Sequence, residues 1–349
     1  MAGPYYVDGA VGDDGNAGTA PGVGNAWATI DKAMNTVVAG EKVWIKASAT
    51  YNENPAIDAG HVGTLVSPIV FEGYTTVPGD GGRAVITGEI QDTTTGRLYF
   101  VFKNFDVSNE AGAGSGRCVM LEGTTVTWKN CVFHDNTALS LVSVGYFQFF
   151  ESCEFNDGVG DGCVCGTAVF VGCKFYRNSL NAIDSESFLA CVFCEFFSNG
   201  SVAIDGAPVN DIPLVVVNCT IVGNDGTTTG ILKNTANQGG VVVVNNIVYD
   251  CIDGMKWGGH ADYPGFGISR NNLVNSNTED YVGGAYTSEG EVTGAPQFAD
   301  EGNNDYSLAS GSPARGAGFD LEGNTDIGAH QSAGAGEVPP LYPWHVGGA

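Results

Sequence analysis

A short pattern that recurs every 20 to 27 residues is the feature that most constrains the fold of this chain. Each copy begins with a small, polar or aromatic residue and has an apolar residue two positions later. The first position falls at Phe105, Cys131, Cys153, Cys173, Cys194, Cys219, Asn246 and Asn272. A repeat of this length is one supersecondary unit that buries its apolar face by stacking on its neighbours.

Within each copy, residue character alternates with the period of a β-strand. The apolar position two residues after the first is filled by Phe133, Phe155, Phe175, Phe196, Ile221, Val248 and Val274. The residues between them, such as Glu154, Lys174, Glu195 and Thr220, are expected on the outer surface. Glycine and β-branched residues crowd every copy, which excludes a helical repeat. The sequence therefore predicts an all-β solenoid of parallel strands, with neighbouring coils about 4.8 Å apart.

A recurring asparagine follows the first position by about five residues. The asparagines concerned are Asn136, Asn178, Asn199, Asn224 and Asn277. Asparagine tolerates a left-handed backbone and bonds to nearby main chain in turns. We expect each of these residues to form a left-handed turn between two strands.

The chain ends differ from the repeats. Residues 26–40 predict a short amphipathic helix with Thr29 as N-cap and Gly40 as its end, followed by a strand at residues 42–45. A helix there would cover the apolar opening of the solenoid. We therefore expect an N-terminal cap and first coil at residues 1–46, the β-helix with its closing segment at 47–330, and an extended tail at 331–349.

Ten cysteines are present, and five of them occupy the first repeat position. Equivalent positions stack in a solenoid, so we expect a ladder of reduced thiols that act as small core residues. Neither Cys163 with Cys165 nor Cys191 with Cys194 has a partner pair or a histidine at zinc-site spacing.

The formal net charge of −25 comes from 39 acidic and only 14 basic residues. So few cations cannot form the basic face that binds nucleic acid phosphates. A surface rich in Asn, Ser, Thr and Gly suits carbohydrate or metal ions instead. We see no signal peptide at the start and no apolar run of 18 residues, so we expect no membrane span. The expected location is a virion or an extracellular surface.

Sequence elements at both ends resemble those of a known family. The opening elements are Tyr6-Val7-Asp8, Trp27-Ala28-Thr29-Ile30 and Gly40-Glu41-Lys42-Val43. The closing elements are Pro296-Gln297-Phe298, Asn304-Asp305-Tyr306-Ser307-Leu308, Ser312-Pro313-Ala314 and Asp326-Ile327-Gly328-Ala329. Over residues 5–330 the chain resembles the right-handed parallel β-helix proteins of the pectate-lyase-like superfamily. The resemblance implies that fold and leaves function open, because the family holds lyases, hydrolases, adhesins and virion proteins.

The catalytic patterns of the family's enzymes are largely missing from this sequence. Family hydrolases carry paired Asp motifs and a Gly-His-Gly, whereas the nearest match is Gly258-Gly259-His260-Ala261-Asp262. Family lyases use calcium-binding acidic residues with an Arg or Lys base, and no matching set is found.

One carboxylate pair is a candidate site. Asp184 and Asp205 lie 21 residues apart, the same step as Cys173 to Cys194, so we expect them to stack on adjacent coils, with Glu186 on the same face. Carboxylates this close repel unless one is protonated or a cation lies between them. Three interpretations stay open: side chains hydrated beside a turn, a calcium site of Asp184, Glu186 and Asp205, or a catalytic acid/base pair.

Two apolar features are candidate binding surfaces. Tyr176, Phe197 and Tyr249 occupy outward positions, where they would form a sugar-stacking strip or contact a neighbouring loop. In the tail, Leu341, Tyr342 and Trp344 follow the closing motif and have no repeat position to fill. We expect these three residues to dock on another protein of an assembly, the alternative being an unstructured terminus.

These observations favour a non-enzymatic β-helix that serves as a surface or assembly protein, of the phage virion type, such as a decoration, fibre or tailspike-like piece. A polysaccharide lyase or glycoside hydrolase with Asp184 and Asp205 as its carboxylates is the first alternative. A bacterial adhesin that binds glycans is the second.

Overall fold

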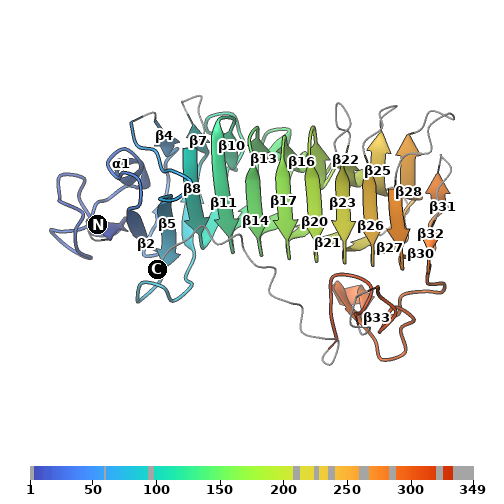
Figure 1. The fold of residues 1–349 in the computed structure, drawn as a ribbon. Coiled ribbons are helices and arrows are strands. Elements are labelled where there is room, and N and C mark those ends of the chain that lie inside the picture. Colours follow the sequence, from blue (N-terminus) through green and yellow to red (C-terminus); the bar gives the residue numbers. More distant parts are fainter. Residues whose placement is uncertain are drawn as a thin grey trace. The chain divides into compact units, whose positions relative to one another are not determined.

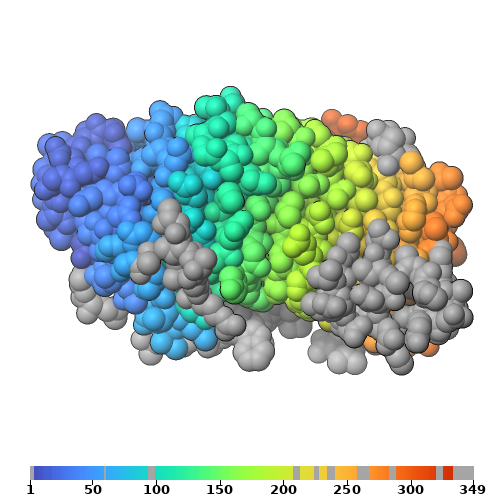
Figure 2. Space-filling view, turned by 90° about the horizontal axis from the view of Figure 1, so that it is seen from above, coloured from blue at the N-terminus to red at the C-terminus, as the bar shows by residue number. Residues whose placement is uncertain are grey.

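The chain folds as a right-handed parallel β-helix (Figure 1). The computed structural model describes residues 4–58, 60–92, 98–206, 213–223, 228–234, 240–258, 267–282, 288–319 and 325–332. The chain divides into two compact units, the first reaching to Cys163 and the second beginning at Val164. Figure 2 shows the coils inside each unit as successive bands of colour packed side by side. The expected boundaries at residues 46 and 330 stay predictions.

In each unit, successive strands of one coil belong to three parallel sheets, which we name A, B and C in chain order. Sheet A of the first unit contains β1 (Tyr5–Asp8), β2 (Lys42–Lys46), β5 (Ile69–Tyr74), β8 (Leu98–Lys103), β11 (Thr124–Lys129) and β14 (Gln148–Glu151). Its sheet B contains β3 (Thr50–Tyr51), β6 (Ala84–Thr87), β9 (Phe105–Ser108), β12 (Val132–His134) and β15 (Glu154–Asn156). Its sheet C contains β4 (Ala56–Ile57), β7 (Ile90–Asp92), β10 (Val119–Leu121) and β13 (Ser140–Val144). The boundary between the units falls within β16 (Asp161–Cys165).

The second unit repeats this order and adds a hairpin. Sheet A contains β17 (Ala168–Val171), β20 (Leu189–Val192), β23 (Leu214–Val217), β26 (Val241–Val244), β29 (Gly267–Arg270) and β32 (Ser288–Glu289). Sheet B contains β18 (Lys174–Tyr176), β21 (Glu195–Phe197), β24 (Thr220–Val222), β27 (Ile247–Tyr249) and β30 (Leu273–Asn275). Sheet C contains β19 (Ile183–Ser185), β22 (Val202–Gly206), β25 (Thr229–Asn234), β28 (Asp253–Gly258) and β31 (Glu279–Val282). The antiparallel pair β33 (Phe298–Asp300) and β34 (Asp305–Leu308) is joined by the 3-10 helix η1 (Glu301–Asn303).

The core is a set of side-chain ladders, because the strand register places equivalent repeat positions in line. In the second unit Phe175 pairs with Phe196, and the register continues to Ile221. The rings of Phe175 and Phe196 stack with centroids 5.0 Å apart and planes 7° from parallel. Such stacked aromatic pairs add to the free energy gained from burial. The period-2 prediction of an apolar inward face is confirmed.

All ten cysteines are buried and free, as the repeat predicted. Cys194 illustrates the environment, because its thiol donates to the carbonyl oxygens of Phe170 at 3.5 Å and Val192 at 3.4 Å. Burial raises the pKa of the Cys251 thiol to about 12, so that thiol stays protonated at neutral pH. The cysteines are therefore packing residues of the core.

The recurring asparagines do not adopt the left-handed conformation that we expected. The left-handed residue is the one before, as at Arg177 (φ 56°) and Ser198 (φ 54°). Asn178 and Asn199 are buried, and the Asn178 amide donates to the Asn199 side-chain oxygen at 3.0 Å. The Asn199 side-chain amide also donates to the Phe175 carbonyl at 2.9 Å, so these side chains supply partners for main-chain groups buried at the corner. Asn224 lies outside the described residues.

The expected helix is present but shorter. Helix α1 covers Ile30–Met34, and Thr29 is its N-cap, accepting from the Lys32 amide at 3.1 Å. The helix ends at Asn35 instead of Gly40, because the Asn35 side-chain amide donates to the Asp31 carbonyl at 3.0 Å and two β-branched valines follow at 37 and 38. The role of α1 as a cap stays a prediction. In the described part of the chain, no helix has the length and apolar character needed to span a bilayer.

Candidate functional site

Asp184 and Asp205 are neighbours on adjacent coils. Asp184 lies on β19 and Asp205 on β22, and the two are register partners, so their main chains are separated by one strand spacing of about 4.8 Å. Both point outward, because side chains alternate along a strand and the preceding Ile183 and Ile204 are fully buried. The sequence prediction of a stacked carboxylate pair is confirmed.

The environment of Asp184 disfavours its charged form. Burial raises the pKa of this carboxyl, and the negative charge of Glu186 raises it further. A carboxyl that is partly removed from water and faces a second acid holds its proton more tightly. The pair is therefore an electrostatically unfavourable arrangement at neutral pH.

The next two coils place no further carboxylate in register with this pair. In the register that follows Asp205, the positions are occupied by Leu232 on β25 and Lys256 on β28. Lys256 Nζ is already bound to Asp253 Oδ2 at 2.7 Å. Among the described residues, no three His, Cys, Asp or Glu side chains gather where they could hold one metal ion. Calcium binding by Asp184, Glu186 and Asp205, one of the three interpretations left open by the sequence, stays a prediction.

The three outward aromatic residues do fall on one face. Tyr176 and Phe197 are register partners with rings 4.9 Å apart and 4° from parallel, and Tyr249 follows two coils after Phe197. Phe197, however, is only 7 % exposed. Something covers this strip.

The cover is the chain's own C-terminal part, which we name the closing segment (residues 292–319 and 325–332). Phe197 packs against Tyr306 of β34 at 5.2 Å between ring centroids, and Tyr249 packs against Phe298 of β33 at 5.9 Å. Phe298 and Tyr306 contact each other edge-on at 5.1 Å. The open sugar-stacking strip is thus wrong for Phe197, and the alternative of contact with a neighbouring segment is what the structure shows.

Further along, the closing segment seals more of the outer face of sheet B. Ala314 and Ile327 form a buried cluster with Ile247 and Leu273, which are outward residues of β27 and β30. Glu195 and Thr220 were expected to be exposed, but they are 6 % and 1 % exposed. The period-2 pattern assigned the correct face to these residues and could not show that a distant segment covers it.

A charged cluster fixes the end of the closing segment. His330 Nε2 lies 3.0 Å from Glu195 Oε1, and Lys174 Nζ lies 3.1 Å from the same oxygen. Burial acts to raise the pKa of Glu195, but the hydrogen bond and charge of His330, helped by Lys174, outweigh it and lower that pKa. A buried carboxylate paired in this way stays ionised.

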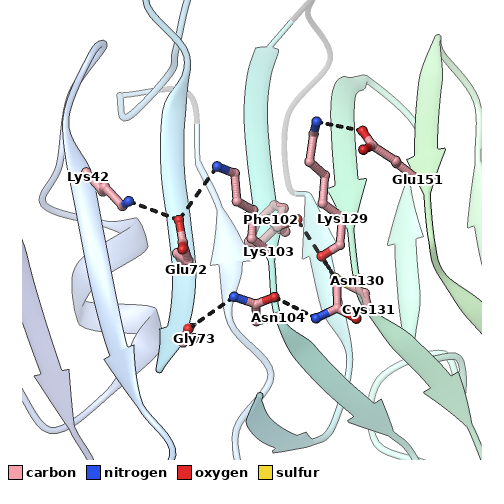
Figure 3. A network of polar contacts seen from close by, with 10 residues as sticks. All are labelled: Lys42, Glu72, Gly73, Phe102, Lys103, Asn104, Lys129, Asn130, Cys131 and Glu151. Carbon is pink, nitrogen blue, oxygen red and sulfur yellow. Dashed lines mark hydrogen bonds and ion pairs between the residues drawn. The ribbon is translucent and has the colours of Figure 1, made fainter. Parts of the chain in front are cut away.

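The outer face of sheet A differs in chemistry between the two units. In the first unit it carries an ion-pair ladder, which Figure 3 shows. Glu72 Oε2 forms ion pairs with Lys42 Nζ at 2.9 Å and with Lys103 Nζ at 3.6 Å. Lys129 Nζ pairs with Glu151 Oε2 at 2.6 Å. In the second unit the equivalent positions are aliphatic, for example Val215 and Val217 on β23.

Sequence reasoning missed one cluster in the first unit. His134 Nε2 lies 2.8 Å from Asp106 Oδ1, and His134 Nδ1 lies 2.6 Å from Asp135 Oδ2. The hydrogen bond that His134 donates to Asp106 raises the pKa of His134 to about 9 against the opposing effect of burial, and Asp135 adds to the rise. The adjacent His-Asp pair at 134–135 was the visible signal, but the partner Asp106 is one coil away. Leu341, Tyr342 and Trp344 lie outside the described residues.

Comparison with known proteins identifies solved structures of similar fold. No protein-family model matches the chain, and no curated protein sequence matches it. A solved pectate lyase, Pel9A, is similar with a TM-score of 0.64 and 19 % identity, over 94 % of this chain and 96 % of that one. A solved rhamnogalacturonan lyase is similar with a TM-score of 0.58 and 16 % identity, over 89 % and 95 %. The chain has the pectate-lyase-like β-helix fold. At these identities the likeness concerns fold alone, and it confirms the resemblance at that level.

Proposed function

We propose that this β-helix is a non-enzymatic surface or assembly component, of the kind found in phage virions as a decoration, fibre or tailspike-like piece. The observation that carries the proposal is the closure of sheet B by the chain's own closing segment. Phe197, Thr220 and Glu195, which lie outward on the solenoid, are buried under that segment. The covered part of sheet B stabilises the solenoid, and its buried side chains are not accessible to a polysaccharide.

The chemistry around the carboxylate pair supports the same proposal. A lyase or glycosidase needs a base or a second acid at a defined distance, and a calcium-dependent enzyme needs several oxygen ligands. The coil after Asp205 offers Leu232, and Lys256 is paired with Asp253. Lys233 is buried, with its pKa lowered to about 8 by burial, but it follows Leu232 on the strand and so points to the opposite face from Asp205.

Labelling with an antibody raised against the folded chain tests the proposal. We expect the label on intact particles or cell envelopes from the source culture, at regular positions. A label found only in the soluble fraction of the medium would contradict an assembly role.

A polysaccharide-cleaving enzyme remains the alternative, and the specific observation in its favour is the register pairing of Asp184 with Asp205. This alternative predicts cleavage that disappears when both carboxylates are replaced. A glycan-binding adhesin predicts binding without cleavage.

A further inference from the structure

The outward face of sheet A in the second unit is aliphatic over nine positions, which we name the valine face, and it ends at Arg270, the second outward residue of β29. Its residues share outward positions on successive strands that stay in register. They are Val169, Val171, Ala190, Val192, Val215, Val217, Val242, Val244 and Ile268. Their inward neighbours, such as Phe170 and Val216, are fully buried in the core. The aliphatic character of this sheet therefore extends to both faces.

An outward sheet face normally carries polar residues, and the first unit follows that rule with its ladder of Lys42, Glu72 and Lys103. The valine face breaks it. Most of its members are half-buried by their neighbours on the sheet, while Ile268 is 54 % exposed. In Figure 1 these strands face the viewer, and no described helix or strand passes in front of β20, β23 and β26. Apolar surface of this kind is usually covered by a partner.

The size of the valine face limits what can cover it. Five strands at about 4.8 Å spacing, with two outward aliphatic residues on each of the first four and one on the last, give a strip roughly 19 Å long and 10 Å wide. A stable interface between folded proteins buries about 800 Å² on each side. The strip is several times smaller than that, and it matches the width of one extended chain.

The described chain ends beside this face. Gly328 donates to the Asn245 carbonyl at 2.8 Å, Ala329 donates to Thr220 Oγ1 at 2.9 Å, and His330 pairs with Glu195. Asn245 directly follows β26, while Thr220 and Glu195 each come three residues after the last residue of β23 and β20. The closing segment therefore runs along the edge where sheet B meets sheet A, stepping from coil to coil toward β20.

The remaining residues, 333–349, have the reach and composition to cover the strip. Fully extended they span roughly 56 Å, well beyond the length of the valine face. They contain Leu341, Tyr342 and Trp344 between prolines at 339, 340 and 343. Prolines hold a segment extended, which reduces the entropy that it loses on docking.

We propose that residues 333–349 dock across the valine face of their own chain. The aliphatic strip would bury Leu341, Tyr342 and Trp344, which the sequence leaves without a repeat position. The docking that the sequence predicts for this tail is then directed at the chain's own sheet A instead of another protein. This inference goes beyond the proposed function and does not depend on it.

Photo-crosslinking of the full chain tests where the tail lies. We would replace Trp344 by p-benzoylphenylalanine and map the crosslinked peptides by mass spectrometry. Crosslinks in the monomer band to strands β20, β23 or β26 are expected. Crosslinks to other surfaces, or crosslinks that join two copies, would overturn the proposal.

Limited chymotrypsin digestion gives a second, independent measurement. In the full chain, cleavage after Leu341 and Trp344 should be slow, and in the double variant Val215→Lys with Val242→Lys it should be roughly tenfold faster, because the open population sets the rate. The matched control is Thr125→Lys with Thr127→Lys on sheet A of the first unit, which should cleave as the natural chain does. Equal cleavage rates in the valine variant and the natural chain, with both melting cooperatively, would refute docking on this face.

Discussion

Phe197 of β21 packs against Tyr306 of β34, with ring centroids 5.2 Å apart, although the two residues lie far apart in the sequence. Both rings are almost fully buried. Through this contact the closing segment becomes part of the second unit's structure, covering the outer face of sheet B. The position of an outward aromatic on a solenoid is therefore insufficient evidence for a sugar site.

Removing the Tyr306 ring should destabilise the second unit strongly. Tyr306→Ala deletes a buried aromatic that contacts Phe197 and Phe298, and the expected loss is about 3 kcal/mol of unfolding free energy. Urea-induced unfolding followed by circular dichroism measures it. The control is Tyr146→Ala, at a site 46 % exposed, which should cost far less. Equal losses in the two variants would mean that the closing segment contributes little.

The Glu195 and His330 contact should make stability depend on acid pH. The pKa of Glu195 is lowered in the folded chain, so its contribution is present above the unfolded carboxyl pKa of about 4.3 and is lost as the pH falls through the folded value. Melting temperatures between pH 3 and pH 7 should therefore fall less steeply with acid in Glu195→Gln than in the natural chain. Identical slopes would show that this carboxylate is not held ionised by the closing segment.

His134 should produce the opposite dependence in the first unit. Its pKa is raised to about 9, so the stabilisation by Asp106 and Asp135 is complete below the unfolded histidine pKa of about 6.5 and is lost as the pH rises toward 9. Titration of the imidazole by NMR measures the pKa directly. Asp106→Asn should bring it down, and an unchanged value in that variant would contradict the contact.

Neutralising Asp184 should leave the chain as stable as before or slightly more stable. Its pKa is raised by burial and by Glu186, so ionisation opposes folding as the pH rises through the folded value. Asp184→Asn removes that opposition at pH 7. Thermal melting with and without added calcium is the measurement. A clear drop in melting temperature, or a calcium-dependent rise that the variant loses, would indicate a cation site.

Thiol counting tests the core ladder. All ten cysteines are buried and free, so they should resist an aqueous thiol reagent in the folded chain and react fully after unfolding without reductant. Fewer reactive thiols in the unfolded chain would indicate disulfides that the fold does not contain.

The repeat predicted the fold because it is a local, periodic signal that the register of the strands preserves. The pairing of Asp184 with Asp205 followed from the same period. The burial of Phe197 could not be predicted, because Tyr306 lies outside the repeats and no sequence period relates the two residues. The asparagine corners were misplaced by one residue, since Arg177 rather than Asn178 takes the left-handed backbone. The side chain of the equivalent Asn199 instead donates to the buried Phe175 carbonyl. Helix α1 was predicted too long, because the bond from Asn35 to Asp31 ends it early.

Product analysis on a panel of acidic and neutral polysaccharides tests the proposed non-enzymatic role of this β-helix most directly. The natural chain and the double variant Asp184→Asn with Asp205→Asn would be incubated with each polymer, with and without calcium, and the products analysed by mass spectrometry. The account predicts no shortened or unsaturated oligosaccharides from either protein. Oligosaccharides released by the natural chain and absent with the folded double variant would contradict it and would identify the carboxylate pair as a catalytic site.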